Sequence, residues 1–393
     1  MFERELVGQL ENRLGEQRRF IQIVTGPRQT GKTTAIRQTL SHLDMPYRIA
    51  MADRELAPGD AWLESEWMQA RTLTSGGTPA VLIVDEIQKV PQWSTTVKRL
   101  WDEDTWNEVP LHVILSGSSS LLIQKGLSES LAGRFELLRL THWSFREMRD
   151  AFGYSLDDFL LYGGYPGAAP LHGDADRWLD YMRGSIIDAT ISKDVLQMED
   201  VRKPELMQRL FYLGAQYSAQ EISYRKLLGQ LDDKGNTDTI AHYLALLSGA
   251  GLMQGLQKYS AKALESRRSS PRLMVQDTSL MVAANGGRPS AMLEDAATRG
   301  HLVETAVGAS LLARAQNERF EVFWWRDGSL EVDFVLRKGQ AVTAIEVKSG
   351  RIKDLRGMTA FLERNPGARP LVVGDVNTSL ESFLLGGVPL FDE

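Results

Sequence analysis

Short apolar runs alternate with helix-like stretches from the start of the chain to about residue 145. Three of these runs predict buried strands, at Phe20–Val24, Ala80–Val84 and Leu111–Leu115. Alternation of short strands with helices is typical of an α/β sheet covered by helices. We therefore expect residues 1–145 to form one α/β domain.

The remainder of the chain changes pattern three times. Residues 146–205 have helical spacing with a Gly/Pro-rich break at 163–167, and residues 206–285 are expected to form three helices followed by a hairpin. A break near 285–289 precedes residues 290–393, in which the segments 330–336 and 342–348 alternate as strands do. The pattern predicts a helical lid, a winged-helix domain and a C-terminal α/β domain.

Composition limits the classes of protein that need to be considered. The chain has 393 residues with 43% hydrophobic and 24% charged residues, as in soluble globular proteins. It contains no Cys, which excludes disulfides and thiolate metal sites. No segment reaches the roughly 18 apolar residues of a membrane span, so we expect a cytoplasmic location and no membrane partner. The net charge of −6 requires any nucleic-acid-binding surface to be local.

One motif dominates the first domain. Its residues follow the strand at 20–24 and lead into a helix pattern: Gly26, Pro27, Arg28, Gln29, Thr30, Gly31, Lys32, Thr33 and Thr34. This is the G-x-x-x-x-G-K-T spacing of a phosphate-binding P-loop. The glycines let backbone N–H groups converge on phosphate, Lys32 supplies a positive charge, and the Thr33 hydroxyl can ligate Mg²⁺. The motif predicts ATP and Mg²⁺ as cofactors.

Four further polar positions complete the predicted ATPase site. Asp85 and Glu86 follow the strand at 80–84, and we assign Asp85 to the Mg²⁺ shell and Glu86 to the attacking water. Ser116 and Ser118 follow the next strand and can sense the γ-phosphate, although an ordinary Ser/Gly turn is the alternative.

Arg134, in the segment Leu-Ala-Gly-Arg, can deliver a guanidinium to the phosphates. It can do so within its own subunit or in a neighbouring one. A surface ion pair is the alternative role for this side chain.

These motifs occur together in a known order. The series GPRQTGKTT, VDEIQKVP, SGSSS, LAGR, SFRE (144–147) and GGYP (163–166) resembles that of bacterial and archaeal AAA-type ATPases with a C-terminal domain of unknown function. Those proteins are related to the STAND and Orc P-loop ATPases. The resemblance covers nearly the whole chain. It implies a P-loop domain (1–145), a helical lid (146–205), a winged helix (206–285) and a restriction-nuclease-like tail (290–393).

The predicted hairpin of the winged-helix segment carries a basic stripe. Its members are Lys258, Lys262, Arg267, Arg268 and Arg272, with Glu265 as the one acid among them. Such a stripe can follow a DNA backbone without reading base sequence. The alternative is a solvated hairpin on a domain that packs against the ATPase core.

The C-terminal segment carries a second candidate site. Asp333 lies on one strand, Glu346 and Lys348 share a face of the next, and Glu304 lies on the preceding helix. This layout is that of PD-(D/E)xK nucleases. Asp333 and Glu346 would hold Mg²⁺ or Mn²⁺, Glu304 would complete the outer shell, and Lys348 would activate water. A catalytically silent tail is the alternative.

Two functions follow from these sites. The first is a Mg²⁺-dependent ATPase that binds DNA by its structure and couples hydrolysis to DNA remodelling or processing, with or without cleavage by the tail. The second is a nucleotide-dependent switch or scaffold that acts on proteins and has a silent tail. In both cases we expect a homo-oligomer, such as a ring, because Arg134 could complete a neighbour's site.

Overall fold

The computed structural model describes residues 2–392 except 55–57, 119–130, 197–200, 202, 232–235, 261–269, 351–354 and 375–376. The chain divides into two compact units, residues 1–141 and 142–393. Within the described ranges, no helix is both long and apolar enough to span a bilayer.

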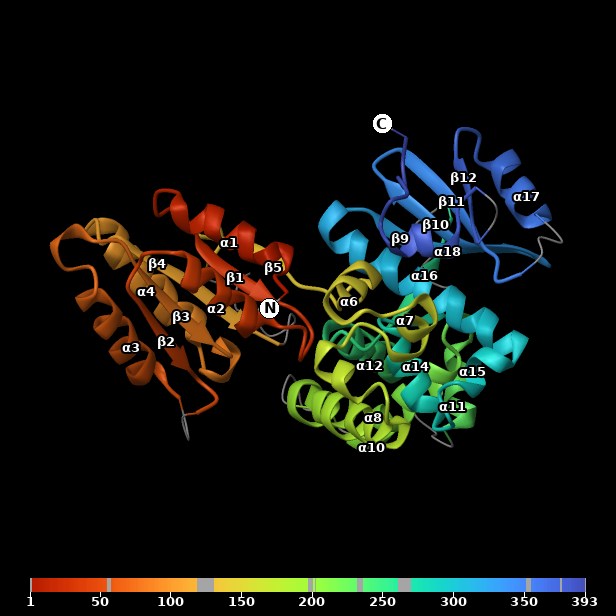
Figure 1. Ribbon diagram of the computed structural model, residues 1–393, viewed down its shortest axis with the longest axis horizontal. Helices are drawn as coiled ribbons and strands as arrows, with labels where there is room; N and C mark the ends of the chain where they lie inside the picture. Colours follow the sequence, from red (N-terminus) through yellow and green to blue (C-terminus); the bar gives the residue numbers. More distant parts are fainter. Residues whose placement is uncertain are drawn as a thin grey trace. The chain divides into compact units, whose positions relative to one another are not determined.

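The first unit is built on a parallel sheet (Figure 1). The strand order is β2-β3-β4-β1-β5, and every pairing in it is parallel. The strands are β1 (Ile21–Thr25), β2 (Tyr47–Met51), β3 (Ala80–Asp85), β4 (Leu111–Gly117) and β5 (Phe135–Arg139). The α/β sheet predicted from the apolar runs is confirmed, and its parallel pairing is a finding of the structure. Because all strands run the same way, their carboxyl ends form one edge, and the P-loop lies there after β1.

Helices cover both faces of this sheet. They are α1 (Glu5–Gly15), α2 (Lys32–His42), α3 (Asp60–Thr72) and α4 (Trp93–Trp106), with short 3₁₀ turns η1 (Ser75–Gly77) and η2 (Ile87–Lys89). One apolar core joins the sheet to α1 and α2 through residues such as Leu10 and Ile36. A second core joins the opposite face to α3 and α4 through Trp67 and Val97. Burial of both faces explains why β1 and β4 are buried throughout, and β3 up to its last residue, rather than at alternate positions.

The second unit begins with helices. In chain order they are α6 (Phe145–Phe152), α7 (Leu156–Tyr162), η3 (Pro166–Leu171), α8 (Ala175–Asp180), the π-helical η4 (Tyr181–Asp188) and η5 (Ile191–Val195), α10 (Pro204–Gln216), α11 (Tyr224–Gln230) and α12 (Thr237–Gly249). Asn236 accepts a hydrogen bond from the N–H of Asp238 and so caps α12, as its sequence position predicts. The helices and hairpin expected over 206–285 are present, and the winged-helix assignment of this segment stays a prediction.

The Gly-Gly-Tyr-Pro motif has a structural role in this unit. The N–H of Gly164 donates to Oδ2 of Asp277 at 2.7 Å, and the carbonyl of Gly164 accepts from the N–H of Trp143 at 3.0 Å. A Cβ added at Gly163 would lie 1.9 Å from Oδ1 of Asp277, and one at Gly164 would lie 2.1 Å from the Trp143 carbonyl. Only glycine fits where this turn meets the start of α14 (Thr278–Asn285).

A seven-stranded sheet joins the hairpin to the C-terminal segment. Its order is β12-β11-β10-β9-β7-β8-β6. The strands are β6 (Gln220–Glu221), β7 (Met253–Lys258), β8 (Arg272–Val275), β9 (Glu321–Asp327), β10 (Leu330–Lys338), β11 (Ala341–Val347) and β12 (Arg369–Val373). β7 pairs with β9 in parallel, so the sheet continues across the domain boundary predicted near residue 290.

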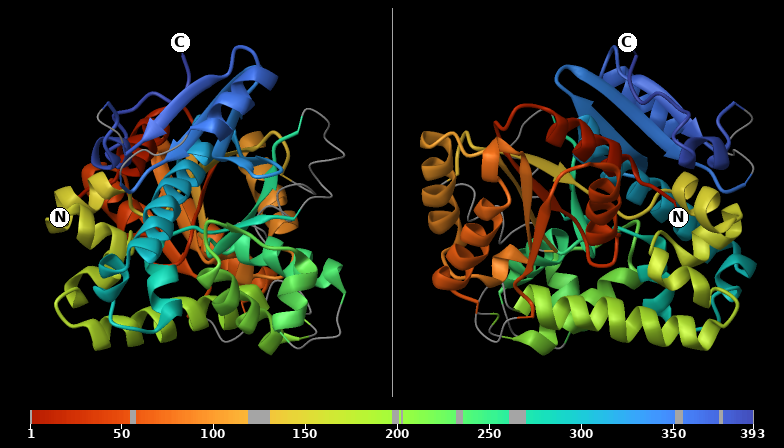
Figure 2. Two further views of the ribbon diagram at one scale, coloured as in Figure 1. Left: turned by 90° about the vertical axis from the view of Figure 1, so that its right-hand side faces the viewer. Right: turned by 60° about the vertical axis from the view of Figure 1, so that its left-hand side comes forward.

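The remaining helices pack around this sheet. They are α15 (Ala291–Glu294), α16 (Ala296–Glu318), α17 (Arg356–Arg364) and α18 (Leu380–Leu384). The long helix α16, cyan in Figure 2, contacts β8, β9 and β11. Trp325 of β9 packs against Phe361 of α17 in the core that also contains residues of the antiparallel β10–β11 pair. Helix α16 therefore carries Glu304 to the strands that bear Asp333 and Glu346.

Candidate functional site

The P-loop turns sharply between β1 and α2. A Cβ added at Gly26 would lie 2.4 Å from the carbonyl oxygen of Leu140, so no other residue fits there without displacing backbone. Gly31 has a φ of 92°, in the left-handed region that favours glycine, and α2 begins at the next residue. The two glycines of the motif are therefore required for different reasons. At Gly26 the Leu140 backbone approaches too closely for a side chain, and at Gly31 the backbone adopts a left-handed conformation.

Lys32 is held against the loop that it belongs to. Its Nζ donates to the carbonyl oxygens of Gly26 at 2.9 Å and Pro27 at 2.8 Å, and its side chain is buried. The Thr30 hydroxyl donates to the Pro27 carbonyl at 2.9 Å. The ammonium group thus lies inside the curl of the loop, where a phosphate would be bound. Of the other motif residues, Pro27 and Arg28 are half-buried, and Gln29 and Thr34 are exposed.

Asp85 connects the P-loop helix to the neighbouring strand. Its Oδ2 accepts from the Thr33 hydroxyl at 3.0 Å, and its Oδ1 accepts from the Ser116 hydroxyl at 2.6 Å. The two oxygens are therefore fixed by residues that follow β1 and by a residue of β4. Carboxylate and hydroxyl oxygens are the hard ligands that Mg²⁺ takes in nucleotide sites. The donor set fits the metal that the motif implies.

Glu86 stands next to this pair in a strained conformation. Its φ of 54° lies in the left-handed region, which is uncommon for residues other than glycine. The Ser118 hydroxyl donates to its Oε2 at 3.3 Å, and the Gln88 amide donates to the same oxygen. Ser116 and Ser118 thus contact the two acids, an arrangement that the sequence pattern did not specify. Gln88 was not predicted, although it lies two residues after Glu86 in the motif.

Of the roles expected of Arg134, the structure fits the surface ion pair and does not fit delivery to the phosphates of its own subunit. It precedes β5, and its carbonyl accepts from the N–H of Ile21 at the start of β1. The P-loop follows the other end of β1, and a five-residue strand separates the two edges by about 16 Å. The guanidinium instead binds Asp102 of α4, with Nε to Oδ1 at 2.7 Å and Nη2 to Oδ2 at 3.0 Å. The structure therefore does not bring Arg134 to the phosphates of its own subunit.

The predicted basic stripe requires correction. Arg272 is 6% exposed and lies inside the second unit rather than on a hairpin surface. Lys258 is half-buried on β7, next to Trp324 of β9. Lys262, Arg267 and Arg268 lie outside the described residues. Arg272 leads a strand whose other residues are all buried, and this apolar context was the sequence signal that it points inward.

The C-terminal acids do come together, and Arg272 lies among them. Its guanidinium forms an ion pair with Glu304 and approaches Oδ1 of Asp333 at 3.6 Å. The backbone N–H of Val347 donates to Oδ2 of Asp333 at 2.8 Å. Glu346 is paired with Lys348 at 2.6 Å, and its Oε2 has no hydrogen-bond partner among the residues that the structure describes. The convergence predicted from strand alternation is thus observed, with an added cation.

Electrostatics at this cluster follow from burial. Burial raises the pKa of Glu304 well above its ordinary value and also raises the pKa of Asp333. Burial, together with the nearby Asp333 charge, raises the pKa of Glu346 to about 7. Burial alone would lower the pKa of Arg272, but the surrounding carboxylates, Glu304 foremost, outweigh it and raise that pKa. Among the described residues, no three His, Asp or Glu side chains are grouped as ligands for one metal ion.

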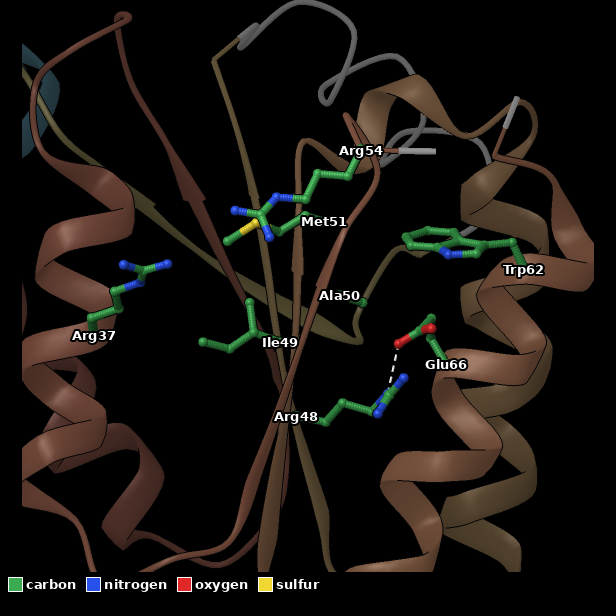
Figure 3. Close-up of a pocket in the computed structure, with 8 residues that line it drawn as sticks. All are labelled: Arg37, Arg48, Ile49, Ala50, Met51, Arg54, Trp62 and Glu66. Atoms are coloured by element: carbon green, nitrogen blue, oxygen red, sulfur yellow. Dashed lines mark hydrogen bonds and ion pairs between the residues drawn. The ribbon is translucent and has the colours of Figure 1, made fainter. Parts of the chain in front are cut away.

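A basic pocket of about 370 Å³ lies beside the edge strand β2 (Figure 3). Arg37 of α2 and Arg54 both line it, and neither has an ion-pair partner among the residues that the structure describes. Arg48 also lines it but is paired with Glu66 at 2.6 Å, and Trp62 adds an indole ring. Met51 of β2 is in register with Asp85, so the pocket lies one strand away from the predicted catalytic acids.

Family comparisons divide the chain into three segments. Residues 18–149 match an AAA domain, and residues 153–291 and 299–385 match two domains of unknown function, DUF8612 and DUF4143. The AAA match and the parallel sheet support an AAA-type P-loop ATPase domain in the first unit.

Similar proteins share only part of this chain's sequence. An uncharacterized protein of Mycobacterium tuberculosis is 30% identical over 66% of this chain and 54% of its own length. The chain therefore spans about half of that relative. An uncharacterized protein of Haemophilus influenzae is 22% identical over 84% of this chain and 82% of its own length. Among solved structures, the Walker-type ATPase of Pyrococcus abyssi is 14% identical over 72% of this chain and 96% of its own, with a TM-score of 0.49.

Proposed function

We propose that this protein hydrolyses ATP with Mg²⁺ at the P-loop and acts as a nucleotide-dependent switch on a protein partner. The observation that carries the ATPase proposal is the hydrogen-bonded connection from Thr33 through Asp85 to Ser116. It links a residue after β1 to the last residue of β3 and to a residue near the carboxyl end of β4, so the sheet supports groups that would surround one Mg²⁺·ATP. Electrostatic positioning of this kind supplies most of the catalysis in phosphoryl transfer.

Each residue has a distinct role in the proposed reaction. Thr33 and Asp85 would hold Mg²⁺, which neutralises the developing charge on the phosphates. Lys32 exchanges two neutral carbonyl acceptors for anionic phosphate oxygens, which form stronger hydrogen bonds with an ammonium. Glu86 orients water and accepts its proton, while Ser118 and Gln88 fix the carboxylate. Ser116 positions Asp85.

We choose a protein partner because Arg272, a member of the predicted basic stripe, is buried in the structure. Arg272 forms internal contacts, so that side chain does not reach a DNA backbone. The chain is acidic overall, with a net charge of −6. Both observations weaken a DNA-coupled function and favour the switch.

DNA remains the second candidate partner, and one observation favours it. Arg37, Arg54 and Trp62 line one pocket on the ATPase unit. Two guanidinium groups beside an indole can bind phosphate and stack a base, as single-strand binding sites do. In this version of the function, DNA would contact the ATPase unit rather than the hairpin.

Steady-state ATP hydrolysis with and without single-stranded, duplex, forked and four-way DNA tests both candidates. We expect Mg²⁺-dependent turnover that is lost in Lys32→Ala and kept in Lys98→Ala, which removes an exposed lysine of α4. Normal turnover in Lys32→Ala would refute the ATPase site. Stimulation by one DNA that falls steeply with salt and disappears in Arg37→Ala/Arg54→Ala would replace the switch by the DNA-coupled function. Hydrolysis indifferent to every DNA supports the switch.

A further inference from the structure

One guanidinium occupies the centre of the C-terminal acid cluster. Arg272 of β8 donates from Nε to the Ala219 carbonyl at 2.8 Å and from Nη1 to the Asp333 carbonyl at 2.9 Å. Its Nη2 is paired with Glu304 of α16 and lies 3.6 Å from Oδ1 of Asp333. The side chain is 7% exposed. All three nitrogens of the guanidinium thus have partners, and they come from three different segments of the second unit.

The carboxylates of a nuclease of this layout would face a divalent metal ion, and here they do not fit one. Glu304 and Asp333 face Arg272, while the other oxygen of Asp333 accepts from the Val347 N–H. Within the described part of the chain, Glu346 keeps one oxygen without a donor, but Lys348 lies on the other. A divalent ion needs several convergent oxygens and is repelled by fixed positive charge. Two fixed cations, Arg272 and Lys348, already face the three acids.

We propose that Arg272 is the resident cation of this cluster, so that the cluster binds no divalent metal ion and instead fastens β8 to β10 and α16. The ion pairs of Arg272 then hold the hairpin and the C-terminal strands together as one rigid body. Asp333, Glu346 and Lys348 catalyse no cleavage. Arginine suits this position because its planar fork holds several acceptors at once, which a lysine ammonium on a flexible stem cannot do equally well. Buried ion pairs are best supported in such a positioning role.

Binding of Mn²⁺ to the nucleotide-free, full-length protein, measured by electron paramagnetic resonance, tests the metal claim. Wild type and Asp333→Asn should give superimposable titrations. Arg272→Met should gain one ion per chain, because the freed carboxylates are hard oxygen ligands, and Arg272→Met/Asp333→Asn should lose it again. Arg326→Met is the matched control, since Arg326 pairs with Glu221 and Glu331 at the surface of the same sheet.

The wild-type comparison decides the metal claim even where Arg272→Met does not fold. A wild-type protein that binds one more Mn²⁺ than Asp333→Asn overturns the proposal. A folded Arg272→Met that gains no ion also overturns it, because Arg272 would then not be the group that keeps a metal ion away from these acids.

Hydrogen exchange followed by mass spectrometry tests the fastening claim. In Arg272→Lys, amides of β8 should exchange at least about tenfold faster than in wild type, because the lysine leaves acceptors unpaired in a buried site. Amides of β1, in the other unit, should be unchanged and serve as the internal control. Unchanged exchange in β8 would show that Arg272 does not hold the strand.

Discussion

The buried carboxyl of Asp277 should make the stability of the second unit fall as pH rises. Asp277 is 4% exposed and caps α14, with Oδ1 accepting from the N–H and hydroxyl of Ser279 and Oδ2 from the N–H of Gly164. No cation contributes to its environment in the described part of the chain. Burial raises its pKa from 3.8 to about 6, although these hydrogen bonds oppose the rise.

The size and sign of the effect follow from linkage. The folded pKa is raised above the unfolded one, so the folded state binds the proton more tightly. Stability is fully present below the unfolded pKa of 3.8 and is lost as pH rises to about 6. A difference of about two pH units corresponds to about 3 kcal/mol of unfolding free energy. Above about pH 6 the loss is complete and this group contributes no further slope.

The assay is urea denaturation at a series of pH values between about 4 and 7. Brief hydrogen-exchange pulses, read by mass spectrometry on peptides of α14, report this unit alone. In Asp277→Asn, the fall in unfolding free energy between about pH 4 and 7 should be smaller than in wild type by about 3 kcal/mol. This difference does not depend on how stable the variant is at any single pH. Asp180→Asn changes the same charge at an exposed position and should keep the wild-type slope. An Asp277→Asn variant that parallels wild type at every pH would refute this account of the buried carboxyl.

Three further predictions concern named contacts. Glu86→Gln should bind ATP but turn it over at least about 100-fold more slowly, because the amide accepts no proton. Filter binding measures the first effect and single-turnover kinetics the second, and a normal rate of hydrolysis would contradict the role of Glu86. Ser116→Ala should raise the Mg²⁺ concentration for half-maximal turnover by about 10–100-fold, whereas unchanged Mg²⁺ dependence would exclude Ser116 from positioning Asp85. Gly164→Ala should lower the melting temperature of the second unit, since its Cβ would lie 2.1 Å from the Trp143 carbonyl, while Gly173→Ala, where a Cβ meets nothing within 4 Å, should not.

Sequence alone could predict the features that depend on neighbouring residues. The P-loop, the buried strands that lead to Asp85 and Ser116, and the alternation that brings Asp333 to Glu346 are all local patterns. Their periods follow from strand geometry, which no distant contact needs to specify. The β2-β3-β4-β1-β5 order could not be derived in this way, because it depends on which apolar faces pack together. The pocket beside β2, which Arg37 and Arg54 line, depends on the same packing.

Two arginines show why charge patterns along a chain mislead about sites. Arg272 was grouped with Lys258 because both belong to one predicted hairpin, yet its partners are Glu304 and Asp333, more than thirty residues away in sequence. For Arg134 the motif left open the phosphates of its own subunit, those of a neighbour, or a surface ion pair. The direction of β5 places it at the opposite edge of its own sheet, where it pairs with Asp102. Both positions have the same physical cause. A guanidinium is stabilised by the carboxylates nearest to it in space, and the order of residues along the chain does not show which carboxylates those are. The consequence differs: Arg272 is committed to its own unit by burial, whereas the half-exposed Arg134–Asp102 pair can open at little cost. The role of Arg134 at the site of a neighbouring subunit therefore stays a prediction, which would require this surface pair to open.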